Sequence, residues 1–483
     1  MMDVIHPAKS CILKVWQQDD GVYLKQEESL IRICPQTETA IRISYTDREE
    51  FCQEQGKEYE KPQKNLLWNW IDRQNETIVA TERVSIRVDK ATGSVRYLDG
   101  AGTVLGKERA KESRMLEKFE IYETVENENL EVKEIVTADG VKRKISGGDK
   151  VFSRYGYRTR TYFDFEPEEI LLGLGQNENG DWNLRNTTQY IHQANRKIGI
   201  PMLISSRGYG ILLSTQSASL FTENKAGAYL QTEADYYLDY YFLGGGDMFQ
   251  VIRDFRRITG KAAMLPKWAY GYIQSQERYE SEDEILAIAD EFQRRDIGVD
   301  CLVLDWMSWP DGLWGQKSFD SSRFPDPSAM IETLHKKGIH FMLSIWPNMS
   351  STTADYKEFA EKKLLFTGTE IYNAFKEEGR QLYWQQVEAK LACHGIDGWW
   401  ADSSEPITPE WEHVIEPEAG QAYKEYVQDS FAVMPPEKAN AYGMYHAKTI
   451  WDGQRHRYSQ KRVVNLTRSG WAGSQRYGTI MWS

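Results

Sequence analysis

The chain has 483 residues, too many for one ordinary hydrophobic core, so two or three domains are expected. Hydrophobic residues make up 41% and charged residues 27%, the usual balance of a globular protein in water. The formal net charge of −13 argues against nucleic acid or an anionic membrane as the main partner, because both would repel an acidic surface.

Cysteine usage and the lack of long apolar runs indicate the compartment. The five cysteines are scattered, with no CxxC or metal-site spacing, so we expect reduced thiols and no disulfide framework. No apolar run is long enough for a signal peptide, and none approaches the ~20 residues of a membrane span. These features predict a soluble, cytoplasmic protein with no membrane partner, and they leave a homo-oligomer open.

Residues 1–262 are predicted to form a first, antiparallel β domain. Short runs in which apolar and polar residues alternate, such as 40–45, 84–88 and 210–214, are separated by Gly, Asn and Asp turns. Alternation of this kind buries one face of an antiparallel sheet. Residues 107–150 are richer in Glu and Lys, and we expect a peripheral strand pair or a surface excursion there.

Residues 263–483 are predicted to form a second, α/β domain, because the pattern changes at Pro266. Apolar strands are predicted at 270–273, 299–304, 339–345, 396–401, 463–467 and 478–481. Helices are predicted between them, the first with Ser281 as N-cap and Glu284 completing a capping box, and the others at 330–337, 381–393, 420–431 and 441–451. Repeated β-α units predict a parallel sheet and favour a (β/α)8 barrel, which six strands leave incomplete.

Chemistry in a parallel barrel gathers where the strands end, because those loops share one opening. The residues just past the predicted strands include carboxylates, indoles and one guanidinium: Asp305, Trp306, Trp346, Trp400, Asp402, Arg468 and Trp482. Sugars present flat C–H faces between hydroxyls, so pockets for them combine aromatic rings with carboxylates. The 16 Trp and 27 Tyr residues fit a sugar site, although a large domain also holds many aromatics.

Two carboxyl groups break a glycosidic bond, and in retaining enzymes they lie about 5 Å apart. Asp402 is the best candidate for the nucleophile, although its position fits equally an Asp that caps the next helix. Asp305 has the same strand-end position and the same alternative. Arg468 could hold the nucleophile ionised or serve as a structural ion-pair partner. Glu405 could act as an acid, but before Pro406 it more plausibly shapes the loop.

No metal or phosphate motif is present. The eight His residues never occur as HxH or HExxH, so no metal site is predicted. Gly244–Gly246 is not followed by Lys-Ser/Thr, and Gly173 with Gly175 lacks the third glycine of a dinucleotide fingerprint.

Six motifs in the same order resemble glycoside hydrolase family 31, the α-glucosidase and α-xylosidase family. They are LGLGQ at 172–176, GIP at 199–201 with SRGYG at 206–210, PKWAYG at 266–271, FD and RFPDP within 319–327, WWADSSEP at 399–406, and Arg468 with AGSQRY at 472–477. Each motif alone is weak evidence, but six in this order strongly indicate the family.

The resemblance implies an N-terminal antiparallel β-sandwich followed by a TIM barrel, with no cofactor. It implies an exo-acting, retaining α-glycosidase in which Asp402 is the nucleophile and Asp305 binds hydroxyls of the terminal sugar. Trp346 and Arg468 would line the sugar's subsite, and the loop 177–186 would reach over the pocket. We add Trp306, Trp400 and Trp482 as substrate-binding candidates on the same rim. The partner would be an oligosaccharide or other glycoside.

Substrate and completeness stay open. Trp306 and Met307 could exclude a hydroxymethyl group, which slightly favours xylose over glucose. In the family a "W.GD" motif carries the acid/base, and this sequence ends at Trp482-Ser483, so it resembles a C-terminally truncated member. We expect a loss of roughly 10²–10⁴ in rate without that acid. The alternatives are a non-catalytic carbohydrate-binding degenerate barrel and an α-transglycosylase.

Overall fold

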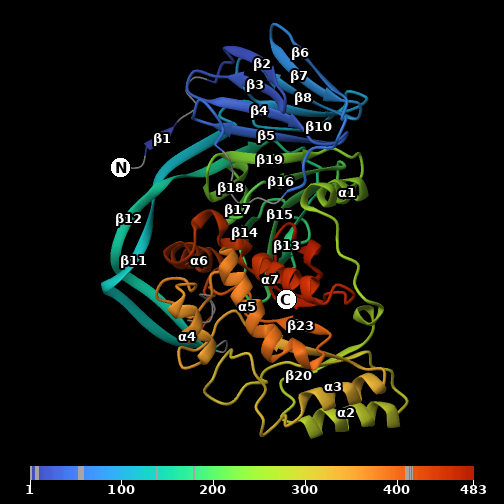
Figure 1. Ribbon diagram of the computed structural model, residues 1–483. Coiled ribbons are helices and arrows are strands. Elements are labelled where there is room, and N and C mark those ends of the chain that lie inside the picture. The colour runs from blue at the N-terminus through green and yellow to red at the C-terminus, as the bar shows by residue number, and fades with distance from the viewer. Residues whose placement is uncertain are drawn as a thin grey trace.

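The computed structural model describes residues 3–5, 10–52, 59–137, 140–177, 180–407, 413, 415 and 417–482. Antiparallel sheets form the N-terminal part of the molecule, and a parallel sheet with helices forms the C-terminal part (Figure 1). In the parts of the chain just given, no helix combines the length and the apolar character needed to cross a membrane.

Three antiparallel sheets make up the N-terminal part. An eight-stranded sheet has the order β13 (Leu171–Asn177), β15 (Lys197–Ser205), β16 (Tyr209–Leu213), β19 (Leu238–Leu243), β5 (Ala40–Thr46), β4 (Leu30–Pro35), β3 (Gly21–Lys25) and β2 (Lys14–Gln18). A five-stranded sheet has the order β10 (Val104–Lys107), β9 (Val95–Asp99), β8 (Val84–Asp89), β7 (Glu76–Thr81) and β6 (Trp68–Asp72). The predicted antiparallel β region is therefore confirmed.

The third sheet carries a long hairpin. Its order is β1 (Asp3–Ile5), β11 (Arg114–Thr137), β12 (Gly140–Phe163), β18 (Gly227–Asp235), β17 (Ser219–Asn224) and β14 (Thr188–Ile191). Strands β11 and β12 have 24 residues each, and their far ends leave the sheet and run down beside the C-terminal part (Figure 1). The strand pair predicted within 107–150 is thus present, but it is longer than expected.

One helix in the N-terminal part was not predicted. Helix α1 (Met248–Thr259) begins after Asp247, whose side chain accepts a hydrogen bond from the backbone N–H of Gln250. Val251 and Ile258 are seven residues apart on one helical face, and both are buried. The polar composition of the segment hid this stripe.

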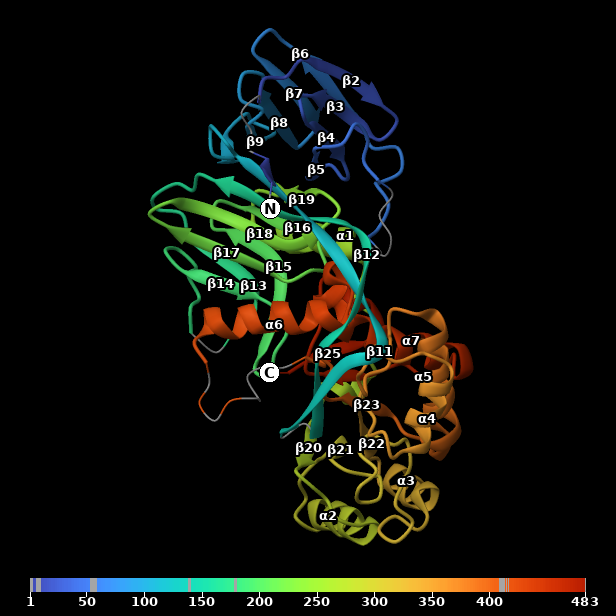
Figure 2. The same ribbon diagram turned by 90° about the vertical axis from the view of Figure 1, so that its left-hand side faces the viewer.

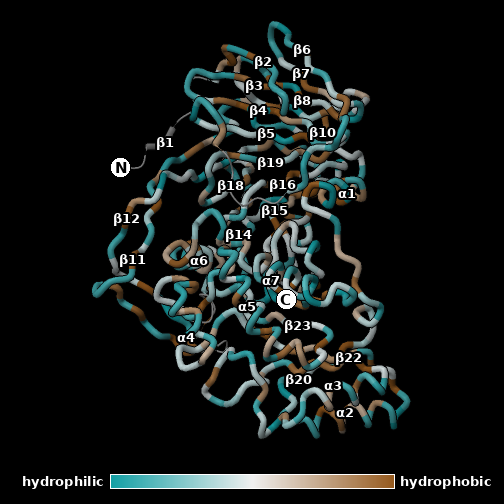
Figure 3. Tube along the Cα trace, in the orientation of Figure 1, coloured by the Kyte–Doolittle hydropathy of each residue, from teal (hydrophilic) through white to brown (hydrophobic). Residues whose placement is uncertain are grey.

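The C-terminal part holds one parallel sheet. Its strands follow the order of the sequence: β20 (Ile273–Gln276), β21 (Cys301–Leu304), β22 (His340–Ile345), β23 (Gly398–Ala401), β24 (Asn465–Thr467) and β25 (Thr479–Met481). These are six of the eight strands that a closed (β/α)8 barrel contains. The strands of this sheet are apolar, as β22 shows, and the loops around them are hydrophilic (Figure 3).

Helices connect these strands. They are α2 (Glu282–Arg294), α3 (Pro327–Lys336), α4 (Ala354–Glu361), α5 (Glu377–Lys390), α6 (Ala419–Val433) and α7 (Tyr442–Arg457), with short 3-10 turns η1 (Lys267–Tyr270), η2 (Ala392–His394), η4 (Pro436–Ala441) and η5 (Ser474–Tyr477). The predicted cap is confirmed, because Ser281 accepts from the N–H of Glu284. The first strand was predicted too early, since Tyr270 lies in η1, and α4 was not predicted.

Buried hydrogen bonds join the two parts. Asn440, which is fully buried, donates from Nδ2 to the backbone oxygens of Ile191 (2.8 Å) and Ser217 (3.0 Å) and accepts from the hydroxyl of Tyr426 (2.8 Å). The indole N–H of Trp471 donates to the backbone oxygen of Thr215 (2.7 Å). Helix α6 lies against β12 and β14 at this junction (Figure 2). The domain boundary predicted after residue 262 stays a prediction.

Replacing Asn440 by Leu should lower the free energy of unfolding by about 3 kcal/mol, because it removes three buried hydrogen bonds at once, two to backbone carbonyls and one from the Tyr426 hydroxyl. Tyr426→Phe removes only one of the three hydrogen bonds and should cost about 1 kcal/mol. Urea denaturation followed by tryptophan fluorescence measures both. Equal losses of unfolding free energy for the two variants would contradict the expectation that all three hydrogen bonds of Asn440 stabilise the fold.

Candidate functional site

Four predicted site residues follow one aligned row of the parallel sheet. The row consists of Ile345, Ala401, Thr467 and Met481, which pair across β22, β23, β24 and β25. The residues that follow them are Trp346, Asp402, Arg468 and Trp482. Because each of these residues comes directly after a member of the row, all four lie at the carboxyl edge of the sheet, as predicted.

Alternation along the strands separates the side chains on the two faces of the sheet. Trp400 packs against the buried cluster that contains Val303 and Val464, which marks one face. Asp402 comes two residues after Trp400, so its side chain points to the same face of the sheet. Trp399 points the other way, and its indole N–H donates to Gln454 of α7 (2.8 Å). Trp399 therefore packs on α7, and Trp400 is the indole on the face of Asp402.

Arg468 joins two carboxylates at the rim. Its Nη1 lies 3.3 Å from Oδ1 of Asp402, and its Nε contacts Oε1 of Glu405. The Glu405 side chain is fully buried, whereas that of Asp402 is 16% exposed. An adjacent guanidinium favours a carboxylate over a carboxylic acid. Asp402 is thus the ionic partner of Arg468 that solvent reaches, and Glu405 is the structural one, which fits its predicted role in shaping the loop.

Asp305 lies close enough to Asp402 for their charges to interact. Burial, followed by the negative charges of Asp402 and Glu277, raises the pKa of Asp305 to about 7, although Arg468 opposes the rise. Asp305 therefore holds a proton more readily than an ordinary aspartate does. Glu277 was missed because the first barrel strand was predicted three residues too early. It directly follows β20, as Asp305 follows β21.

The predicted indoles form two groups. Trp400 and Trp482 face one another, with ring centroids 4.6 Å apart, and both are half-buried. Trp346 is only 3% exposed, and its ring centroid lies 5.1 Å from that of Trp314. Its indole N–H donates to Oγ of Ser344 (3.0 Å). Trp346 is thus a packed wall of the site. Its predicted contact with sugar stays a prediction.

Trp306 stands at the edge of the second group. Its ring lies 5.7 Å from that of Trp314, and the guanidinium of Arg278 lies 4.7 Å from its centroid. Met307, predicted to share the exclusion of a hydroxymethyl group with Trp306, is 5% exposed and packs with Trp309 and Trp346. Trp306 is therefore the better placed of the two to contact a ligand.

Two segments of the N-terminal part matter for the rim: the loop 177–186, which was predicted to reach over the pocket, and the long hairpin. Residues 178 and 179 of the loop 177–186 lie outside the described residues. The described part is held by its own sheet, where Asn183 accepts from the N–H of Leu171 (3.3 Å). The predicted reach of this loop over the pocket stays a prediction. The long hairpin does contact the barrel, where Lys142 Nζ donates to Ser403 Oγ (2.9 Å). This contact was missed because it joins residues 261 positions apart.

One group with metal-ligand chemistry lies at the other end of the strands. His335 in α3, His340 at the start of β22 and Asp397 just before β23 have potential ligand atoms within 4.8 Å of one another. Asp397 already contacts His335 Nε2 (2.6 Å) and Lys461 Nζ (2.9 Å). Burial raises its pKa, but a hydrogen bond from His340 and the charge of Lys461 outweigh burial and hold that pKa well below its ordinary value. These contacts fit an ion-pair cluster that ties the strand starts together.

Comparison with known proteins identifies relatives. The family model described as "Glycosyl hydrolases family 31 TIM-barrel domain" matches residues 262–483. An α-xylosidase from Saccharolobus solfataricus is 38% identical over 344 residues, which is 68% of this chain and 45% of that protein. An uncharacterized family 31 glucosidase from Pseudescherichia vulneris is 28% identical over 344 residues, 68% of this chain and 61% of that protein. The chain spans about half the length of these curated relatives.

Solved structures share the fold. A GH31 α-xylosidase from Xanthomonas citri superposes with a TM-score of 0.80 at 20% identity, covering 96% of this chain and 65% of that chain. A GH31 dextranase from Flavobacterium johnsoniae, complexed with glucose, has a TM-score of 0.80 at 21% identity, covering 98% of this chain and 56% of that chain. At these identities the likeness concerns the fold, and it agrees with the predicted β domain followed by barrel strands.

The raised pKa of Asp305 predicts a pH-dependent stability difference. A carboxyl group whose pKa rises on folding destabilises the folded state increasingly as pH rises from its unfolded pKa of about 4 to its folded pKa of about 7. Asp305→Asn should therefore gain more stability over the wild type at pH 8 than at pH 4, measured as urea midpoints.

Asp320→Asn is the matched control. Hydrogen bonds from Ser322 and Arg323 lower the pKa of Asp320, so this variant should be less stable than the wild type by a nearly constant amount from pH 4 to pH 8, because both the folded and the unfolded pKa lie below that window. A difference between Asp305→Asn and the wild type that stays constant from pH 4 to pH 8 would contradict the raised pKa.

Proposed function

Because the chain belongs to glycoside hydrolase family 31, we propose that it is a retaining, exo-acting α-glycosidase that releases terminal α-linked xylose or glucose. Asp402 is the nucleophile in this proposal, and Asp305 binds hydroxyls of the terminal sugar. The domains 1–262 and 263–483 are the β-sandwich and the catalytic barrel. The observation that carries the proposal is the contact between Arg468 and the solvent-accessible carboxylate of Asp402.

The surroundings of Asp402 support its role. A nucleophilic carboxylate must be ionised, oriented and reachable by the substrate. Arg468 supplies a positive charge at 3.3 Å, and the backbone N–H of Ser403 donates to Oδ1 of Asp402 at 2.7 Å. One oxygen is thereby engaged by the protein. The position at the sheet's carboxyl edge is where barrel enzymes carry out chemistry.

The proposed reaction has two displacements. An oxygen of Asp402 attacks the anomeric carbon, the bond from that carbon to the leaving group breaks, and the leaving group departs with the bonding electrons. The product is a β-linked glycosyl ester of Asp402. Water then attacks the same carbon from the opposite face and releases a proton to solvent, the bond between that carbon and Asp402 breaks, and Asp402 returns to a carboxylate. Two inversions give net retention of the α configuration.

The proposed preference for xylose rests on Trp306. Xylose lacks the hydroxymethyl group of glucose, and a bulky side chain at that end of the sugar leaves no room for this group. Trp306 is half-buried, with Trp314 on one side and Arg278 over its ring, so it presents a fixed surface. The similarity to the Saccharolobus α-xylosidase supports the same preference.

Covalent trapping tests the nucleophile directly. A 5-fluoro-α-xylosyl fluoride should label the protein, because its fluoride leaves without protonation by a general acid while the ring fluorine slows both displacements. Mass spectrometry of a protease digest should find one sugar on the peptide that contains Asp402. Asp402→Asn should abolish labelling, whereas Asp320→Asn should not. No label on the wild type, or a label on another peptide, would falsify the proposed nucleophile.

Shortening Trp306 tests the specificity. Trp306→Ala should raise the rate of fluoride release from α-glucosyl fluoride relative to α-xylosyl fluoride by about 10-fold or more, since one substituent group is typically worth 10–200-fold in selectivity. Trp70→Ala, on the distant strand β6, should leave the ratio unchanged. If Trp306→Ala slows both substrates equally, the side chain supports the site without selecting the sugar.

A further inference from the structure

The β11–β12 hairpin ends against the catalytic rim. Beyond the segment of β12 that pairs with β18, the two strands pair with one another as far as Thr137 and Gly140. Figure 1 shows this arm running from the antiparallel sheets to the region of α4 and α6. A two-stranded arm gains its order from what it contacts. Its contacts therefore indicate what it does.

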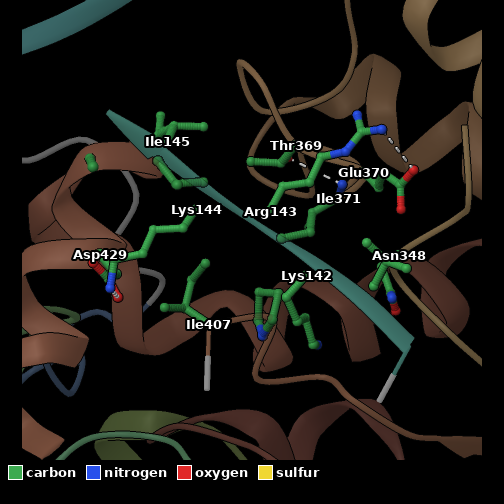
Figure 4. Close-up of a pocket in the computed structure, with 14 residues that line it drawn as sticks. Lys142, Arg143, Lys144, Ile145, Asn348, Thr369, Glu370, Ile371, Ile407 and Asp429 are labelled. Atoms are coloured by element: carbon green, nitrogen blue, oxygen red, sulfur yellow. Dashed lines mark hydrogen bonds and ion pairs between the residues drawn. The ribbon is translucent and has the colours of Figure 1, made fainter. Parts of the chain in front are cut away.

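Three successive cationic residues near the end of the arm contact three separate segments. Lys142 Nζ donates to Ser403 Oγ (2.9 Å), and Lys144 Nζ donates to Asp429 of α6 (2.9 Å). Arg143 pairs with Glu370 (3.3 Å) in the loop that follows β22. Figure 4 shows Lys142 and Lys144 on one side of the strand and Arg143 on the other, which is the alternation of a β-strand.

Near Lys142 the arm is packed closely against the barrel. The cavity between them, lined by Lys142, Asn348 and Ile407 among others, has a volume of about 40 Å³ (Figure 4). That is room for about one water molecule and none for a sugar ring. Ile145 is 9% exposed and packs next to Gly368, where an added Cβ would meet its Cγ2 at 2.8 Å. Around Lys142 and Ile145 the arm therefore supports the rim, whereas a larger cavity of about 1130 Å³ lies elsewhere along it, between Leu130 and Val132 of β11 and the segment 363–369.

Ser403 links the arm to Asp402. It directly follows Asp402, its φ is +46°, and its N–H donates to Oδ1 of Asp402 (2.7 Å). A residue other than glycine keeps this left-handed conformation where its surroundings hold it. The side chain of Ser403 is held by Lys142 while its backbone orients the carboxylate. The chain of contacts thus runs from the arm through Ser403 to Asp402.

Resting on the proposed function, we propose that Lys142 is a positioning residue, which fixes Ser403 and thereby the attack geometry of Asp402. It acts from the other domain and without touching the substrate. Loss of this contact lets the loop that follows β23 move, so the carboxylate spends less time aligned with the anomeric carbon. Misplacement on the scale of 1 Å at a reacting group costs up to about 100-fold in rate.

The test compares matched variants in the labelling reaction with 5-fluoro-α-xylosyl fluoride. Lys142→Met should lower the maximal labelling rate by about 10-fold or more and leave the half-saturating concentration unchanged, since Lys142 acts through Ser403. Lys142→Arg keeps a donor and a charge, and it should restore most of the rate. Lys144→Met loses the same charge two residues away on the same face, and it should label like the wild type.

Hydrogen exchange gives a readout that does not need turnover. Amide exchange in the peptide that contains Ser403 should be faster in Lys142→Met than in Lys144→Met, at equal urea midpoints for the two variants. Equal exchange in this peptide, or equal labelling rates for the two variants, overturns the role of Lys142. If the wild type does not label at all, the proposed nucleophile is refuted. The role of Lys142 is then decided by the hydrogen-exchange comparison only.

Discussion

The contact of Arg468 with Asp402 and Glu405 is the interaction on which the site depends. A buried guanidinium is tolerated only when carboxylates compensate its charge, and a buried Glu405 is tolerated only beside such a cation. Arg468 follows β24 and both carboxylates follow β23, so the pairing fixes two neighbouring loops in one arrangement. Asp402 is left as the one member of the triad that solvent reaches. Asp305 then feels a negative neighbour and holds its proton more tightly.

Much of the barrel could be predicted from the sequence because buried parallel strands are continuous apolar runs. The strands at β21, β22 and β23 were found within three residues of their ends, and the rim residues followed from where those runs stop. The first strand was misplaced because Tyr270 continues an aromatic pattern while Pro266 starts a 3-10 turn. That single shift hid Glu277. Pattern alone fails where local turn chemistry competes with apolar composition.

The remaining failures concern long-range partners. The hairpin strands β11 and β12 alternate charged and apolar side chains, which indicates strands but not what their charges contact. Lys142 and Ser403 carry no local sign of one another across 261 positions. Trp399 and Trp400 are identical in type, and only strand parity separates the indole that packs on α7 from the one near Asp402. The family resemblance supplied order along the chain and not these contacts.

The arm's pleat restricts how its length can vary. Because side chains alternate with a period of two, inserting or deleting one residue between Lys144 and the part of β12 that pairs with β18 would exchange the faces of all three cations. Arg143 would then meet the segment after β23, and the two lysines would meet the loop after β22. Changes of two residues preserve the pattern and only slide it along the barrel. Among related chains that keep this docking, the number of residues between the cations and the part of β12 that pairs with β18 should therefore differ by even numbers.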